Sequence, residues 1–146
     1  GERPLVMVGG APYARELTER VRTLADRRVL LPGPIYGEGY RELLFGCRLY
    51  IHATEVGGTH PALVEAMGAS RPVLYYDTPE NRAVVANAGR RFRFTGETAL
   101  EAVLAEVVDD EPQLAELAAR SRRRVDERYR WHDVADAYER VLRDMC

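Results

Sequence analysis

Residues 48–67 read RLYIHATEVGGTHPALVEAM. The apolar run of this stretch ends at His52 in a polar loop with two glycines, and a helical pattern begins at Pro61. Strand, glycine-bearing loop and helix in this order are the elements of a βα unit. The backbone N–H groups of Gly57 and Gly58 can approach a ligand closely, and the helix start adds unpaired donors and the positive end of the helix dipole. The stretch therefore predicts an anion site at the carboxyl end of a strand.

The rest of the chain repeats this alternation of short apolar runs with helical patterns, which is typical of a parallel sheet. Pro12, Pro61 and Pro79 suit the first turn of a helix, and Thr78 is a good N-cap before Pro79. After the fifth run the pattern is purely helical. We therefore predict an α/β, Rossmann-like fold, with a parallel five-stranded sheet flanked by helices and further helices at the C-terminal end. The predicted strands are Leu5–Val8, Val29–Leu31, Leu49–His52, Val73–Tyr76 and Phe92–Phe94.

Length and composition predict one domain over residues 1–146, since 46% of the residues are hydrophobic. The formal charge of -2 gives no reason to expect nucleic acid as a partner. All 21 basic residues are Arg, so a Walker-type phosphate loop and a Schiff-base lysine are both excluded within this chain.

Neither a metal site nor a membrane span is predicted. Cys47 and Cys146 have no metal-ligand spacing, the three His residues are dispersed, and no Asp-x-Asp pair follows a strand. No run is apolar enough to span a bilayer and no signal peptide is recognisable, so a reducing cytoplasm is the expected location.

Glycines and polar residues follow four of the predicted strands. They occupy Gly9 and Gly10, residues 32–35, residues 55–60 and residues 77–81. In open parallel sheets, ligands bind beyond the carboxyl ends of the strands, so we expect these loops to form one ligand crevice. Glu65 lies one helical turn after Pro61 and should face the same end of its helix.

Four segments carry a resemblance to a known family. LVMVGGAPYARELTERV, RVLLPGPIYGEGYRELLFGCRLYIHATE, EAMGASRPVLYYD and WHDVADAYERVL resemble the C-terminal, donor-binding half of GT-B glycosyltransferases, most closely the retaining family 4. GGTHPALVEAM is similar to a bacterial subgroup associated with rhamnosyl transfer to surface polysaccharides. The resemblance implies metal-independent transfer, without a cofactor, of a hexosyl or deoxyhexosyl group from a nucleotide-diphosphate sugar to a glycan or another acceptor.

The resemblance gives roles to residues of the opening stretch. Glu65 matches the acid that accepts hydrogen bonds from the ribose hydroxyls of the donor, and a carboxylate with two acceptor oxygens suits a vicinal diol. Gly57, Gly58 and Thr59 match the loop whose N–H groups meet the donor sugar and diphosphate. His60 is expected only to line the cleft.

The chain also departs from the family pattern. The acid that contacts the transferred sugar should stand eight residues before Glu65, where this sequence has Gly57. Glu55 is the nearest substitute and is our candidate catalytic residue. Ser70 and Ala83 stand where the family commonly has Gly and Glu.

The first two loops match other parts of the family's donor site. Gly9 and Gly10 match a glycine turn that lines the cleft, while Pro34 and Ile35 fall where the family's backbone meets the base. In the family, a strand bearing an Arg and a Lys, and an N-terminal acceptor-binding domain, would precede Gly1. We therefore expect this chain to work with its own N-terminal domain and not to turn over alone.

The absence of that upstream strand raises a question of strand pairing. We expect residues 5–8 to pair directly with residues 49–52, in the order 2-1-3-4-5, which keeps every crossover right-handed. The alternative is a strand supplied from elsewhere.

Two other functions are compatible with the pattern of strands and helices. One is a flavodoxin-like nucleotide-binding or signalling module without catalysis, and the other is a GT-B-like sugar-nucleotide epimerase.

The C-terminal helices carry an apolar stripe and a basic run. Trp131, Tyr138 and Val141 are expected to form a packing stripe, the alternative being a stacking platform for bases. We expect the basic run to pair with acidic residues of the preceding helix, the alternative being contact with an anionic membrane that holds a lipid-linked acceptor. The run comprises Arg120, Arg122, Arg123, Arg124, Arg128 and Arg130.

Overall fold

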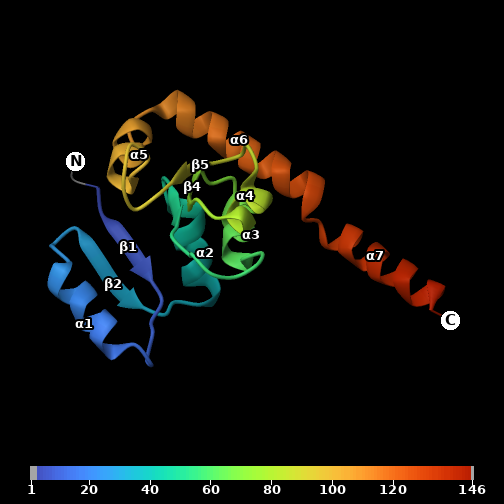
Figure 1. Cartoon of the computed structure of the whole chain (residues 1–146), viewed down its shortest axis with the longest axis horizontal. Coiled ribbons are helices and arrows are strands. Elements are labelled where there is room, and N and C mark those ends of the chain that lie inside the picture. The colour runs from blue at the N-terminus through green and yellow to red at the C-terminus, as the bar shows by residue number, and fades with distance from the viewer. Residues whose placement is uncertain (1–2, 146) are drawn as a thin grey trace. The chain divides into compact units, whose positions relative to one another are not determined.

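The computed structural model describes residues 3–145. Helices and strands alternate along the chain as predicted, and the paired strands are parallel (Figure 1). The described residues form two compact units, divided between Leu43 and Leu44. Each unit contains its own sheet, and the single domain expected over residues 1–146 stays a prediction.

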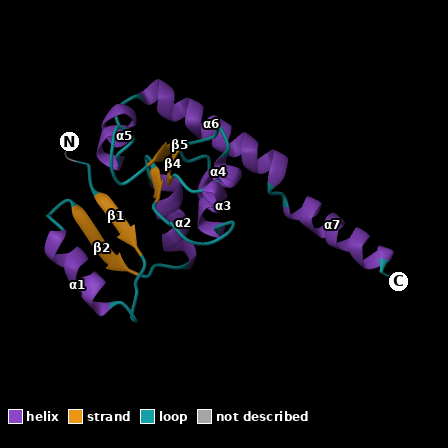
Figure 2. Ribbon diagram, in the orientation of Figure 1, coloured by secondary structure: helices purple, strands orange, loops and turns teal. Residues whose placement is uncertain are grey.

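The first unit is a two-stranded parallel sheet with one connecting helix (Figure 2). None of its described residues, 3–43, is buried. Pro12 was expected in the first turn of a helix but precedes the helix, which begins at Arg15 without a side-chain cap. The elements are β1 (Leu5–Val8), α1 (Arg15–Leu24), β2 (Val29–Gly33) and the first part of α2 (Gly37–Gly46).

The predicted pairing of residues 5–8 with residues 49–52 is wrong. The strands form one sheet of two and one sheet of three, in the orders β1-β2 and β3-β4-β5, and not one sheet of five. The prediction assumed that an unpaired strand edge would be buried and therefore costly. All four residues of β1 are exposed, so water can hydrogen-bond the backbone groups at its free edge.

The second unit holds the buried core. Thr78 is confirmed as an N-cap, because its Oγ1 accepts a hydrogen bond from the N–H of Asn81 at 3.1 Å. Pro61 and Pro79 occupy first-turn positions as predicted. The unit contains β3 (Tyr50–His52), α3 (Pro61–Gly68), β4 (Val73–Tyr76), α4 (Pro79–Val85), β5 (Arg90–Phe92), α5 (Leu100–Val107), α6 (Glu111–Arg128) and α7 (Trp131–Asp144).

β4 is the centre of this core because both of its faces are covered. Val73 and Tyr75 point to one side and pack with α3 and α4, while Leu74 points to the other side with α5 and α6. The first cluster comprises Leu63, Met67, Val73, Tyr75, Val84, Val85 and Ala88, and the second comprises Leu74, Phe92, Val103, Val107, Leu114 and Leu117.

The fifth strand begins two residues earlier than predicted, at Arg90, and ends at Phe92. Beyond the strand, the N–H of Arg93 donates a hydrogen bond to the carbonyl of Thr98 at 2.7 Å. Phe94 is exposed and stacks on the ring of Tyr76 at 4.3 Å between ring centres, so it packs through its ring rather than as part of a strand.

Three arginines of α6 donate to backbone carbonyls, namely Arg120, Arg122 and Arg124. The acids that pair with Arg120 and Arg122 are Glu116 and Asp126, which lie on α6 itself and not, as expected, on the preceding helix. Arg122 donates to the carbonyl of Gly68 at 3.0 Å, at the end of α3. Arg124 donates to the carbonyls of Ala83 and Val84 at 2.8 and 3.1 Å, at the end of α4. Cations at helix C-termini satisfy the last carbonyls and complement the helix dipole, so these side chains join α6 to both helices.

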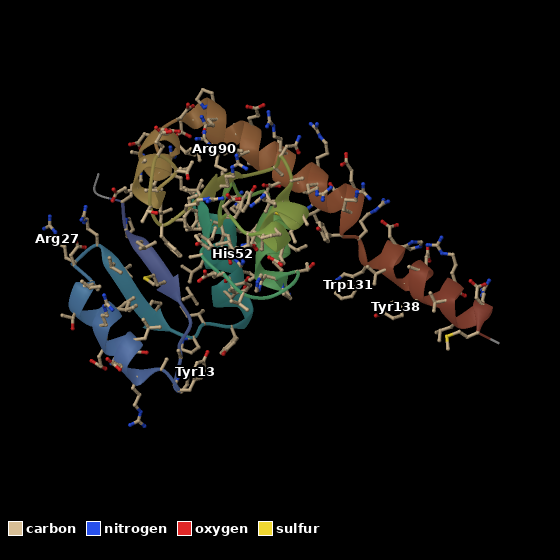
Figure 3. All side chains as sticks on the ribbon, viewed as in Figure 1. Tyr13, Arg27, His52, Arg90, Trp131 and Tyr138 are labelled. Carbon is tan, nitrogen blue, oxygen red and sulfur yellow. The ribbon has the colours of Figure 1, made fainter. Side chains whose placement is uncertain are left out.

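The predicted apolar stripe on the last helix is present, but its large side chains are exposed. Trp131 and Tyr138 are 85% and 70% exposed, and both project from the same side of α7 (Figure 3). Nothing within the described residues buries these two side chains, so the packing role expected of the stripe stays a prediction. No helix within the described residues is long and apolar enough to cross a membrane.

Candidate functional site

The glycine turns of the first unit bring two strand ends together. The N–H of Gly9 donates to the carbonyl of Gly33 at 3.0 Å. A Cβ added at Gly10 would lie 3.7 Å from the ring of Pro34, so these two predicted residues are in van der Waals contact range. Ile35 approaches the next helix, since a Cβ at Gly39 would lie 3.2 Å from its Cγ2. Gly9, Gly10, Pro34 and Ile35 therefore lie at the carboxyl ends of β1 and β2, as predicted.

In the second unit, the loop between β3 and α3 carries most of the predicted site residues. Residues 53–59 are all exposed. The N–H groups of Gly57, Gly58, Thr59 and Ala62 have no hydrogen-bond partner among the described residues. A row of free N–H groups at a helix start is suited to an anionic ligand.

Gly57 has a conformation and a neighbour that only glycine tolerates. Its φ is +135°, and a Cβ there would lie 2.7 Å from Cε1 of His60. The imidazole of His60 thus packs directly against the loop backbone. This packing leaves no room for a side chain at residue 57.

His52 lies behind His60 at the end of β3. Its side chain is buried, and the two imidazole centres are 4.9 Å apart. Burial, with a smaller contribution from the charge of His60, lowers the pKa of His52 to about 4. His52 is therefore neutral at physiological pH, and its Nε2 is buried without a hydrogen-bond partner.

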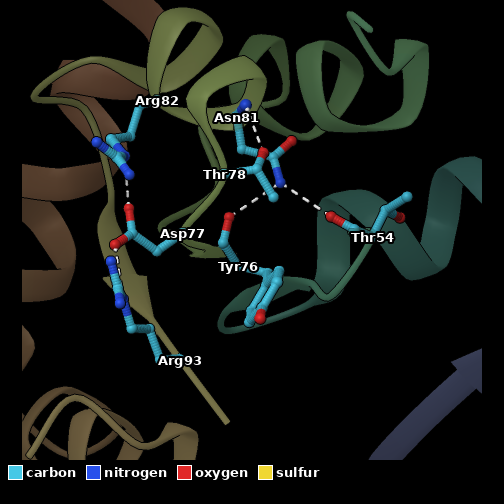
Figure 4. Close-up of polar contacts among 7 residues, drawn as sticks. All are labelled: Thr54, Tyr76, Asp77, Thr78, Asn81, Arg82 and Arg93. Carbon is cyan, nitrogen blue, oxygen red and sulfur yellow. Dashed lines mark hydrogen bonds and ion pairs between the residues drawn. The ribbon is translucent and has the colours of Figure 1, made fainter. Parts of the chain in front are cut away.

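Asn81 connects this loop to the end of β4 (Figure 4). Its Nδ2 donates to the carbonyls of Thr54 and Tyr76, both at 3.0 Å. The side chain is fully enclosed, and its Oδ1 has no partner. The first turn of α4 thereby holds the first part of the loop.

Asp77, the next residue after β4, is a buried carboxylate between two arginines. Arg93 donates to its Oδ2 at 3.0 Å, and Nε of Arg82 lies 2.7 Å from its Oδ1 (Figure 4). The contact with Arg82 is an ion pair whose angle is unsuited to a hydrogen bond, so Oδ1 lacks a hydrogen-bond donor.

Three buried side-chain atoms of the described residues lack hydrogen-bond partners, and all belong to residues at or just after the carboxyl ends of β3 and β4. Buried polar groups are normally paired, so these atoms are places where a water molecule or a ligand could bind. The atoms are His52 Nε2, Asp77 Oδ1 and Asn81 Oδ1.

The two candidate acids lie on consecutive elements. Glu55 is exposed in the loop, and Glu65 is exposed on α3, one turn after Pro61. The charge of Glu65 reaches Tyr50, where burial is the main cause of a raised tyrosine pKa and Glu65 adds to it. Glu65 therefore lies on the helix that follows the glycine loop and close to the strand that precedes it.

Asn81 was predicted only as the last residue of a crevice loop, without a role of its own, and His52 was expected only to be structural. A signal for Asn81 is present in the sequence. Asn81, Val84 and Val85 share one helical face, so a polar residue occupies the first position of an otherwise buried apolar face. For His52, burial emerges only when β4 pairs with β3, and its position in the sequence does not reveal it.

No group of three or more His, Cys, Asp or Glu residues that could hold a metal ion occurs within residues 3–145. The expectation that the chain needs neither metal nor cofactor stays a prediction.

Comparison with protein families gives a match over most of the chain. The family described as glycosyl transferases group 1 matches residues 2–120. The chain belongs to this family. The predicted resemblance is thereby confirmed at the level of a glycosyltransferase domain, while family 4 and the rhamnosyl subgroup stay predictions. No curated protein matches the chain.

Solved structures with the same fold confirm the α/β, Rossmann-like architecture of this glycosyl transferases group 1 domain. Anabaena Alr3699/HepE in complex with UDP superposes with a TM-score of 0.81 at 18% identity, covering 97% of this chain and 41% of that one. Its complex with UDP-glucose gives 0.80 at 20% identity, with the same coverage. Sucrose-phosphate synthase from Thermosynechococcus elongatus gives 0.81 at 18% identity, covering 97% and 38%. The chain thus spans about two fifths of these proteins.

Proposed function

We propose that this chain is the donor-binding domain of a glycosyltransferase and binds a nucleotide-diphosphate sugar at the carboxyl ends of its strands. The observation that carries the proposal is the match to glycosyl transferases group 1 over residues 2–120. The complexes of Alr3699/HepE with UDP and with UDP-glucose favour a uridine nucleotide as the first donor to test.

Each part of the second-unit site has a role in this proposal. Glu65 accepts hydrogen bonds from the ribose hydroxyls, and the N–H groups of Gly57, Gly58 and Thr59 donate to the diphosphate or the sugar. Fixed N–H donors in a strand-end loop stabilise the negative charge that develops on a departing diphosphate. Glu55 is proposed to contact the transferred sugar.

The finer features of the reaction are part of the same proposal. Transfer of a hexosyl or deoxyhexosyl group with retention of configuration, without a metal, follows the family 4 resemblance. The acceptor is a glycan or another molecule that a separate N-terminal domain binds, and the reaction takes place in the cytoplasm. A surface polysaccharide is the acceptor class that the rhamnosyltransferase resemblance favours.

Isothermal titration with UDP and UDP-glucose tests the site. Glu65→Ala should lose a charge-assisted hydrogen bond worth roughly 1.5–3 kcal/mol, which corresponds to an affinity about 10- to 150-fold lower. Glu127→Gln, an exposed change on α6, is the matched control and should bind as the unaltered protein does. Equal affinity of the Glu65 variant and the unaltered protein would refute the assignment.

The same titration tests metal independence. Affinity for UDP-glucose should be the same in a chelator and in excess magnesium. An affinity that appears only with magnesium would contradict this part of the proposal.

A further inference from the structure

We propose that Asn81 is a positioning residue that holds the loop of residues 54–59 in the conformation that binds the donor. The inference rests on the proposed function and extends it to a residue on a different element, α4.

The geometry places Asn81 where the sheet stops. The pairing of β3 with β4 ends at His52 and Tyr75. Beyond that point, Nδ2 of Asn81 donates to the carbonyls of Thr54 and Tyr76, both at 3.0 Å. The side-chain amide thus replaces the ladder and keeps the two diverging strand ends joined (Figure 4). Two carbonyl acceptors require the NH₂ group at this position, which fixes the orientation of the amide.

This bridge is the one polar restraint on the loop. Among the described residues, no other group hydrogen-bonds to the backbone of residues 54–59. The loop includes Gly57 and Gly58, and glycines lose more conformational freedom on ordering than other residues. A restraint at Thr54 therefore limits how far the following N–H groups can move.

Asn81 is itself rigid enough to serve as an anchor. It is 1% exposed, its own N–H donates to Thr78, and it shares a buried helical face with Val84 and Val85. Packing alone does not explain an amide here, because its Oδ1 is buried without a partner and an apolar side chain would avoid that cost.

Two variants of Asn81 and one control distinguish an effect on the loop from an effect on the stability of the whole domain. Asn81→Leu removes both donated hydrogen bonds while keeping the branched shape of the side chain, although its methyl groups are larger. The milder Asn81→Ser is smaller and leaves a hydroxyl too short to span both carbonyls. Ser121→Ala is the matched control, because Ser121 is fully buried and its hydroxyl donates to the carbonyl of Ala88 at 3.1 Å, outside the loop.

The first measurement is cleavage after Glu55 by a glutamate-specific protease on the intact protein, with the melting temperature recorded for each variant. We expect both Asn81 variants to be cut at this bond about fivefold faster than Ser121→Ala, compared at equal distance below each melting temperature. Equal rates would overturn the inference.

The second measurement is the affinity for UDP-glucose by titration. The Asn81 variants should bind about fivefold more weakly than the unaltered protein, and Ser121→Ala within about twofold of it. Faster cleavage with unchanged affinity would overturn the role in donor binding. If the unaltered protein binds neither UDP nor UDP-glucose, the proposed function is wrong, and cleavage after Glu55 still decides whether Asn81 holds the loop.

Discussion

His52 is a buried residue whose charge state depends on the fold. It is 5% exposed, and burial lowers its pKa from 6.5 to about 4. Between these two values the unfolded chain binds a proton that the folded chain does not. Folding is therefore favoured at higher pH, and this contribution to stability is lost as the pH falls from about 6.5 toward 4.

This linkage gives a prediction about stability against pH. The full shift corresponds to at most about 3 kcal/mol. Urea unfolding of the unaltered protein should show a free energy of unfolding that decreases from pH 7 to pH 4. His52→Gln, which does not titrate, should show a shallower decrease. Parallel curves for the unaltered protein and His52→Gln would show that His52 does not titrate in this way.

Two positions at which the sequence departs from the pattern of the family it resembles have a positive φ. Ser70, at a position where the family commonly has Gly, has a φ of +56°, in the left-handed region that favours glycine. Gly57 combines a φ of +135° with the close approach of His60, so a side chain cannot replace it without moving the imidazole. The backbone conformation typical of Gly is thus kept at residue 70 although the residue differs.

At the scale of elements, the arginines of α6 stabilise the ends of other helices. Arg124 contacts two carbonyls at the end of α4 and lies 6.0 Å from the ring centre of Tyr129. Arg124→Ala should lower the free energy of unfolding by about 1–2 kcal/mol, because it removes charged hydrogen bonds at a helix C-terminus. Thermal or urea unfolding measures the change.

Arg123→Ala is the matched control for this prediction. Arg123 is the preceding residue of the same helix, is exposed, and has no hydrogen bond or ion pair within the described part of the chain. Its loss should change the stability by less than about 0.5 kcal/mol. Equal effects of the two substitutions would mean that the carbonyl contacts of Arg124 contribute nothing measurable.

The elements were predictable where local chemistry determines them. Thr78 followed by Pro79 defined a helix start, and the apolar run from Val73 defined the central strand, since each depends only on neighbouring residues. Strand partners were less predictable. The apolar run at residues 5–8 does not show which other strands it pairs with. We assumed that both edges of this strand would be buried and paired, and this assumption led to the wrong strand order.

The loop residues of the candidate site were predictable from the sequence, but the hydrogen bonds that hold the loop were not. Glycine spacing and family resemblance identified residues 57–59 and Glu65, whereas the contacts of Asn81 with Thr54 and Tyr76 join residues 27 and 5 positions apart. The bond to Thr54 depends on the packed structure, because this partner is distant in sequence. The same holds for Arg122 and Arg124 of α6, whose carbonyl partners lie 40 or more residues away in sequence.

At the scale of the whole molecule, burial is distributed unevenly between the two units. The buried hydrophobic residues all lie between Leu44 and Leu117, whereas none of the described residues before Leu44 is buried. Hydrophobic burial is the main source of folding stability, so the two units should differ in local stability.

Hydrogen exchange tests this difference directly. Backbone amides of β1 and β2 should exchange through local opening that costs little free energy, while amides of β4, covered on both faces, should exchange only when the second unit unfolds. After correction for intrinsic rates, peptides covering residues 5–33 should exchange at least about 100-fold faster than peptides covering residues 73–76. Added urea should accelerate exchange of β4 steeply and that of β1 only weakly, because local opening exposes little new surface. Equal protection and equal urea dependence would mean that the chain unfolds as one cooperative body, with the exposed strands as stable as the buried ones.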